Sequence, residues 1–185
     1  MRRGFKTEAR EIATEMRDEL RLASVDPLDP WNLADHLDIP VWTLSSYRSA
    51  IPDSAGHLLA QDPKAFSAML AFAGLRRVII HNDEHALTRQ RADICHELGH
   101  ALLLHRPHPS AGTGRLQFDS EQEDEAHWLG AVLLVPDEFC LACAKRSLPL
   151  ADAAAQMGVS GQLMRWRFNM SGASRRVSRA QAASR

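Results

Sequence analysis

The sequence has little of what marks secreted, membrane-embedded or disulfide-stabilised proteins. It contains three cysteines in 185 residues, Cys95, Cys140 and Cys143, without the spacing of a disulfide framework. Cys140 and Cys143 form a single C-x-x-C, which we expect to lie on a helix as small buried groups. The longest apolar run, residues 129–135, is far too short to span a bilayer, and the N-terminus lacks the apolar core of a signal peptide. We therefore expect a cytoplasmic protein with reduced thiols and no membrane contact.

An excess of charge of one sign is also absent. The sequence has 22 basic and 23 acidic residues, a net charge of −1, so nothing in the bulk composition favours direct binding to nucleic acid. Hydrophobic residues make up 45% of the chain, which is typical of a globular domain able to bury a core. Residues 171–185 are the exception, with four arginines and no acid. We predict one domain over residues 1–170, followed by a basic, disordered tail.

The pattern of apolar residues predicts an α+β fold. Strands are expected at residues 39–44, 65–72 and 77–81, forming a small mixed or antiparallel sheet. Residues 45–63 read as irregular. Helices are expected at residues 5–22, 31–37, 85–105, 121–134 and 137–146, and residues 150–168 read as a helix-turn-helix-like segment. In this segment Met164, Trp166 and Phe168 favour packing over DNA binding.

The segment His96-Glu97-Leu98-Gly99-His100 is an H-E-x-x-H motif within a predicted helix. Residues four apart lie on one helix face, so His96 and His100 can direct ring nitrogens at one Zn²⁺ ion. Glu97 is offset by one position and is predicted to act as the general base on a zinc-activated water. Gly99 lowers helix propensity, which indicates that another backbone approaches closely there.

A catalytic zinc usually takes three protein ligands, and the third must come from outside this motif. The metzincin pattern fails because Leu103 and Arg106 stand where it needs Gly and His. His105 is expected to point away from the ligand face. The acidic start of the next helix offers Glu123 and Glu125, and helix geometry favours Glu123, with Glu125 as the alternative.

These residues resemble the ImmA/IrrE metallopeptidases. The resemblance rests on His96–His100, on Glu123-Asp124-Glu125-Ala126, and on Leu133-Leu134-Val135-Pro136, and it extends over about residues 5–172. It implies a gluzincin-like zincin helical bundle, one zinc per chain and Glu123 as third ligand. It also implies cleavage of a helix-turn-helix transcriptional repressor, under DNA-damage, stress or mobile-element control. Because the sequence begins at the helix typical of the peptidase, we expect the repressor to be a separate polypeptide.

The sequence departs from the family pattern in two places. His127 stands where the family has Asn or Asp, and Leu129-Gly130 replaces Phe-Ala. The resemblance implies that the residue at 127 is a hydrogen-bond partner of a ligand histidine.

Other positions are candidates for parts of the site. His81, His85 and Tyr47 are candidates for stabilising the oxyanion of a tetrahedral intermediate. The strand at residues 77–81 is expected to form the cleft edge to which an extended substrate adds as a further strand. The alternatives to a zinc endopeptidase are a catalytically silent repressor-binding module and a DNA-binding protein.

Overall fold

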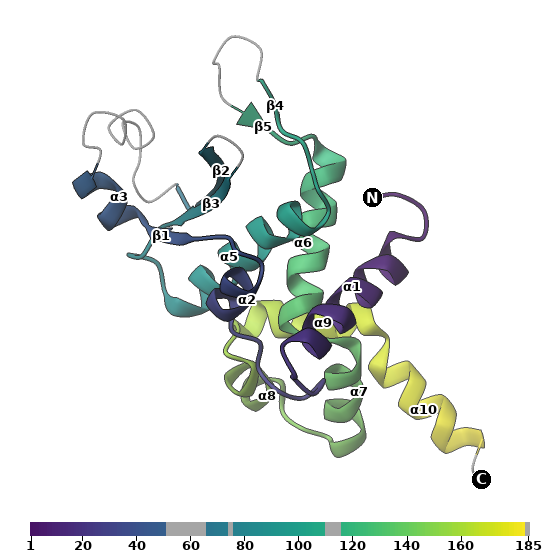
Figure 1. Cartoon of the computed structure of the whole chain (residues 1–185). Coiled ribbons are helices and arrows are strands. Elements are labelled where there is room, and N and C mark those ends of the chain that lie inside the picture. Colours follow the sequence, from purple (N-terminus) through teal and green to yellow (C-terminus); the bar gives the residue numbers. More distant parts are fainter. Residues whose placement is uncertain (51–65, 74–75, 110–115, 184–185) are drawn as a thin grey trace.

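The computed structural model describes residues 1–50, 66–73, 76–109 and 116–183, and it has a mixed α+β fold that is mostly helical. The helices are α1 (Phe5–Glu19), α2 (Pro30–His36), α3 (Leu44–Ala50), α5 (Leu87–Leu102), α6 (Ser120–Leu134), α7 (Asp137–Arg146), α8 (Leu150–Met157), α9 (Gly161–Ser171) and α10 (Ala173–Ala183). The strands are β1 (Val41–Thr43), β2 (Ala68–Ala73), β3 (Arg76–His81), β4 (His108–Pro109) and β5 (Leu116–Gln117). In Figure 1, α6 runs through the middle of the molecule, between α1 and the side that carries α5 and the sheet.

The predicted three-stranded sheet is present, with the strand order β1-β3-β2. β1 pairs parallel with β3, and β2 pairs antiparallel with β3. The expectation that residues 77–81 form an exposed cleft edge is wrong, because β3 is the central strand and is paired on both sides. The edge near α5 is β2, and Leu70 of β2 directs its backbone N–H away from β3, toward α5.

The core of the molecule is the crossing of α5 and α6. Gly99 of α5 lies so close to α6 that a Cβ there would be 2.7 Å from the Ala126 carbonyl oxygen. Gly130 of α6 lies equally close to α5, and a Cβ there would be 2.8 Å from the Cys95 carbonyl oxygen. The close approach predicted at Gly99 is thus confirmed. The two glycines let the backbones of the motif helix and the acidic helix meet.

We expect alanine at Gly99 or Gly130 to destabilise the protein. Each added methyl group would force apart two packed backbones, and overpacking of this kind costs about 1–3 kcal/mol. Urea unfolding measures the loss, with Gly161→Ala as the matched control because a Cβ at Gly161 meets nothing within 4 Å. Unchanged stability in both core variants would show that the helices separate at little cost.

Two buried arginines, one on α1 and one on α9, donate hydrogen bonds to backbone carbonyls at the C-terminal end of α6. Arg17 of α1 donates to the Leu133 carbonyl at 2.9 Å, and Arg167 of α9 donates to the Val135 carbonyl at 3.0 Å. Arg167 also pairs with Asp137 at 2.5 Å, and Arg10 pairs with the other oxygen of that carboxylate at 2.6 Å. A buried charge is tolerated only when it is paired and hydrogen-bonded, and these contacts provide both. The second helix of the helix-turn-helix-like segment therefore uses Arg167 for packing.

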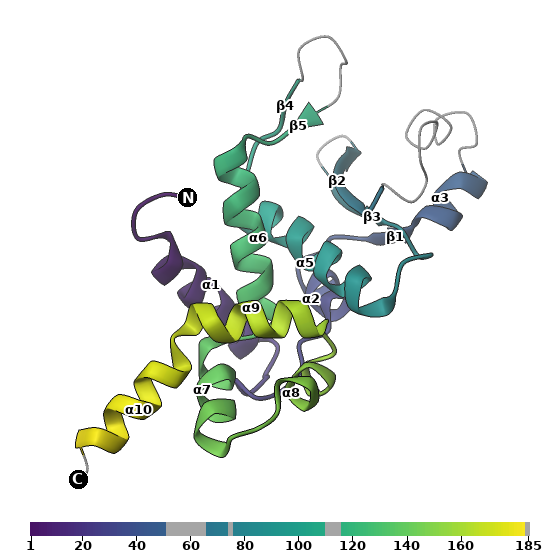
Figure 2. The ribbon, with the colours of Figure 1, turned by 180° about the vertical axis from the view of Figure 1, so that it is seen from behind.

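Two segments differ from the sequence-based expectation. Residues 44–50, read mostly as irregular, form α3, while residues 51–63 lie outside the described part of the chain. The segment predicted as a disordered tail contains the helix α10 (Figure 2). This helix follows Gly172, which has a φ of 65°, and its residue Ala173 is buried. Its alanines and arginines are strong helix formers, and that propensity outweighs the polar composition.

Two further expectations concern buried, reduced cysteines and the absence of a membrane-spanning segment. Cys95, Cys140 and Cys143 are all buried and free. Burial raises the pKa of the Cys95 thiol to about 12 and that of Cys140 to about 11. Among the described residues, no single helix is long and apolar enough to cross a membrane; one pair, α6 and α7, reaches the length and composition jointly across a 49° bend.

Candidate metal centre

Three side chains converge where α5 crosses the start of α6. His96 and His100 lie one turn apart on α5, and their Nε2 atoms are 3.2 Å apart. Glu123, in the first turn of α6, places Oε2 3.1 Å from His96 Nε2 and Oε1 3.7 Å from His100 Nε2. One ligand atom from each residue lies within 4.8 Å of the others, and this is the one His/Cys/Asp/Glu group with such spacing in the described chain.

These distances fit a single tetrahedral cation. Ligand atoms that each lie about 2.0–2.1 Å from a tetrahedral zinc are about 3.3–3.4 Å from one another. The separations of 3.1, 3.2 and 3.7 Å bracket that value. Two imidazole nitrogens that face each other also need a proton or a cation between them, because both cannot direct lone pairs at the same space. The group is therefore a possible two-histidine, one-carboxylate metal site, a donor set that suits zinc.

Glu97 lies beside this group and is held in place by the edge strand. Its side chain is 7% exposed, and Oε2 accepts the Leu70 N–H at 2.8 Å. Burial raises the pKa of the Glu97 carboxyl to about 7, and a nearby divalent cation would lower it again. A carboxylate in this position can take up a proton near neutral pH.

The charges in the cluster are coupled. The hydrogen bond from His96 keeps the pKa of Glu123 below its usual value despite partial burial. Burial alone would lower the pKa of His96, but Glu123 and Glu97 outweigh it, so the pKa of His96 is raised. His100 is 1% exposed and lies beside His96, and burial lowers its pKa to about 3. His100 is thus neutral and buried, and its ring has a lone pair for a metal ion, as metal binding requires.

His105, expected to point away, instead contacts His100. The helix ends at Leu102, and Leu104 adopts a left-handed conformation with a φ of 53°. His105 N–H then donates to the His100 carbonyl at 3.0 Å, and the two Nδ1 atoms lie 2.9 Å apart. As expected, His105 is not among the three converging side chains, but it contacts the other ring nitrogen of His100 because the helix predicted to reach residue 105 ends at Leu102.

The start of α6 is built to cover His100. Asp119 caps the helix by accepting the Gln122 N–H at 2.8 Å, and the Gln122 side chain accepts the Asp119 N–H in return. Phe118, just before the cap, stacks on the His100 ring with centroids 3.7 Å apart. The capping box therefore fixes the helix in the register that brings Glu123 to the histidines.

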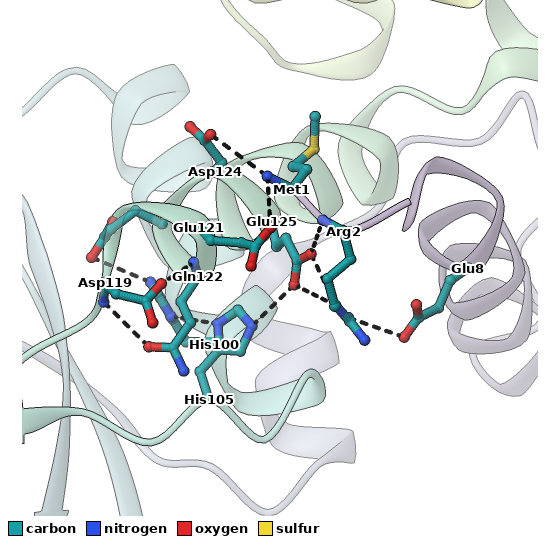
Figure 3. Close-up of polar contacts among 11 residues, drawn as sticks. Met1, Arg2, Glu8, His100, His105, Asp119, Glu121, Gln122, Asp124 and Glu125 are labelled. Atoms are coloured by element: carbon teal, nitrogen blue, oxygen red, sulfur yellow. Dashed lines mark hydrogen bonds and ion pairs between the residues drawn. The ribbon is translucent and has the colours of Figure 1, made fainter. Parts of the chain in front are cut away.

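Glu125, the alternative third ligand, contacts Arg2 and does not face the histidine pair. It is buried and accepts the Arg2 backbone N–H at 2.8 Å and the Arg2 Nε–H at 3.0 Å (Figure 3). Its Oε2 atom lies 3.7 Å from His105 Nε2. Glu123 and Glu125 thus face different partners, and Glu123 is the one at the histidine pair.

Comparison with known families identifies one that covers the part of the chain with the metal-site group. The family model of the IrrE N-terminal-like domain, Peptidase M78, matches residues 46–169, which is more than half of the chain. The chain belongs to this peptidase family. A search of curated proteins found none that matches the sequence significantly. Membership in the IrrE-like family supports a metallopeptidase and implies a metal, and the matched region includes His96, His100 and Glu123.

Position 127, the departure from the IrrE-like pattern, lies near the cluster without a hydrogen bond to it in the described structure. The rings of His127 and His96 have centroids 6.4 Å apart, and His127 packs edge-on against Trp166 at 5.6 Å. His127 and His96 also line a cavity of about 260 Å³. The second departure, Gly130, is explained by the close crossing with α5.

The three oxyanion candidates lie on other elements. His81 is 2% exposed, ends β3 and packs edge-on against Trp31. His85 contacts Asn82 at 3.3 Å and Asp93 at 3.7 Å, at the start of α5. Tyr47 is half-buried in α3. Among the described contacts, none of the three has a hydrogen bond or ion pair to the metal-site group.

Proposed function

We propose that this protein is a zinc-dependent endopeptidase that hydrolyses a peptide bond in a protein substrate. The observation that carries the proposal is the convergence of His96, His100 and Glu123 at tetrahedral spacing, with Glu97 buried beside them. When bound there, Zn²⁺ would supply Lewis acidity that lowers the pKa of water to about 7. As part of this proposal, α5 and α6 form a zincin-type helical bundle and the protein acts in the cytoplasm.

Glu97 is the general base in this proposal. The Leu70 N–H holds one carboxylate oxygen, which orients the side chain and leaves the other oxygen to take and return a proton. Burial raises the pKa of this carboxyl group and a bound cation would lower it, so with zinc present the group would be an ionised carboxylate able to accept a proton. A module that only bound its partner would need no such acid at this place, so the arrangement favours an enzyme over a silent binding module.

The substrate strand would lie along the outer edge of β2, which pairs with no strand other than β3 among the residues that the structure describes. In the antiparallel pairing, Ala68, Leu70 and Phe72 alternate with residues bonded to β3, so their backbone groups face outward. The Leu70 N–H is already bonded to Glu97, so the substrate would pair with the Leu70 carbonyl and with the groups of Ala68 and Phe72. An extended peptide adds to such an edge through main-chain hydrogen bonds. A cavity of about 220 Å³, lined by Leu70, Phe72, His100 and Leu104, lies beside the edge and could take a substrate side chain.

We further propose that the substrate is a helix-turn-helix transcriptional repressor. This rests on the family to which the chain belongs, because the metal site itself carries no information on the protein that is cleaved. The DNA-binding alternative is less well supported, since Arg167 of the helix-turn-helix-like segment is buried against Asp137.

The proposal is tested with purified protein and a repressor encoded beside its gene. Metal analysis is expected to give about one zinc per chain, in keeping with a single three-ligand site. The zinc-loaded protein should cleave the repressor at one or a few sites, and a chelator should stop cleavage until zinc is restored. Preparations without zinc, made without chelator, would contradict the metal site; intact repressor with bound zinc would contradict the substrate.

A further inference from the structure

We propose that His105 and Glu125 are positioning residues that fix the tautomer and ring orientation of His100, and that Arg2 holds Glu125 in place. The four side chains form a continuous series from the metal-site group to the N-terminal segment (Figure 3). The inference rests on the proposed function, because its purpose is to prepare His100 for binding zinc.

The backbone places His105 where this role requires it. The left-handed Leu104 reverses the chain after α5, and the hydrogen bond from His105 N–H to the His100 carbonyl closes the turn. The two imidazole rings then meet edge to face, with centroids 5.1 Å apart. This hydrogen bond ties His105 to the end of the helix that carries His100, so the His105 ring is held next to the His100 ring.

The proton positions along the series follow from hydrogen-bond chemistry. A neutral imidazole has one N–H donor and one acceptor nitrogen. If His100 binds a cation through Nε2, its proton lies on Nδ1, so Nδ1 of His105 must accept across the 2.9 Å contact. The His105 proton is then on Nε2, the nitrogen that faces the Glu125 carboxylate at 3.7 Å. A negative charge there favours this tautomer over the opposite one.

Burial strengthens the preference for these proton positions on His100 and His105. The side chains of His105 and Glu125 are 7% and 3% exposed, so water offers little alternative hydrogen bonding. Glu125 has its charge balanced by Arg2, which contributes both its backbone N–H and its guanidinium. The same Arg2 side chain reaches Glu8 of α1 at 3.3 Å. The N-terminal segment thus holds the carboxylate, which orients His105, which orients His100.

The test compares zinc affinity, measured by chelator competition, in full-length variants. His105→Phe keeps a planar ring but removes the acceptor, and it is expected to weaken zinc binding about 10–100-fold, as loss of a ligand's hydrogen-bond partner typically does. His105→Asn places an amide oxygen where histidine has Nδ1, and it is expected to restore most of that loss. Glu125→Gln keeps an oxygen but loses the charge, so a smaller loss than in His105→Phe is expected.

The matched control is His36→Phe, the same exchange at a histidine that is 37% exposed on α2. Circular dichroism and urea unfolding of the metal-free proteins show whether each variant folds, and His105→Ala replaces His105→Phe if the larger ring is not accommodated. Wild-type affinity in the folded His105→Phe or His105→Ala protein would overturn this inference alone. So would an equal loss in His105→Asn. Failure of the wild-type protein to bind zinc would instead overturn the proposed function, and the inference with it.

Discussion

Replacing Glu97 with glutamine is expected to leave about one zinc per chain and to lower the rate of substrate cleavage by about 10²–10⁴-fold, the contribution typical of a positioned general base. Glutamine has nearly the same shape and can still accept the Leu70 N–H through its amide oxygen. It cannot take a proton from water at neutral pH. The substitution therefore removes the acid–base function while the local packing is kept.

The measurement is a single-turnover cleavage assay together with metal analysis of the same preparation. Glu11→Gln, an exposed position on α1, is the control for removing one acidic charge. Full cleavage activity in Glu97→Gln would mean that another group is the base. Loss of zinc together with activity would place Glu97 among the residues that hold the metal.

Glu123→Ala has the second large expected effect, a loss of zinc affinity greater than the 10–100-fold typical of residues that act through a ligand. The substitution removes the oxygens that lie 3.1 and 3.7 Å from the two ring nitrogens and leaves a two-histidine site. It also removes the negative charge that offsets the cation. Chelator competition measures the effect, and activity is expected to fall with zinc occupancy.

Two comparisons make this result specific. Glu121→Ala, on an exposed side chain in the same helical turn, should bind zinc as the wild type does. Glu125→Ala should weaken zinc binding less than Glu123→Ala, because Glu125 acts through His105 and does not face the histidine pair. The reverse order would move the third ligand to Glu125.

Much of the site could be predicted from the sequence because its parts are local. The spacing of His96 and His100 places both rings on one face wherever those residues form a helix. Helix geometry favoured Glu123 over Glu125, and the structure brings Glu123 to the histidines. The argument placed Glu123 on the buried face of the helix, but Glu125 is the buried one and the side chain of Glu123 is 48% exposed. Gly99 indicated a close approach because glycine in a helix interior weakens it without compensation unless another backbone lies near.

The parts that the sequence did not predict depend on how distant segments meet. The Arg2–Glu125 contact joins residues 123 positions apart, and no periodicity in either segment signals it. The stacking of Phe118 on His100 was not predicted, because it depends on the packing of α6 over α5. The central place of β3 was missed because strand order depends on pairing partners, which alternation along one strand does not encode.

The sequence by itself determined that this chain is an α+β domain with an H-E-x-x-H helix and an acidic helix after it, because helical spacing fixes which side chains share a face. Only the tertiary structure decided what surrounds His100. A single left-handed residue, Leu104, turns His105 back onto the ligand, and long-range packing brings Glu125 and Arg2 behind it. Such contacts arise from chain reversal and from the meeting of distant segments, which no local pattern specifies.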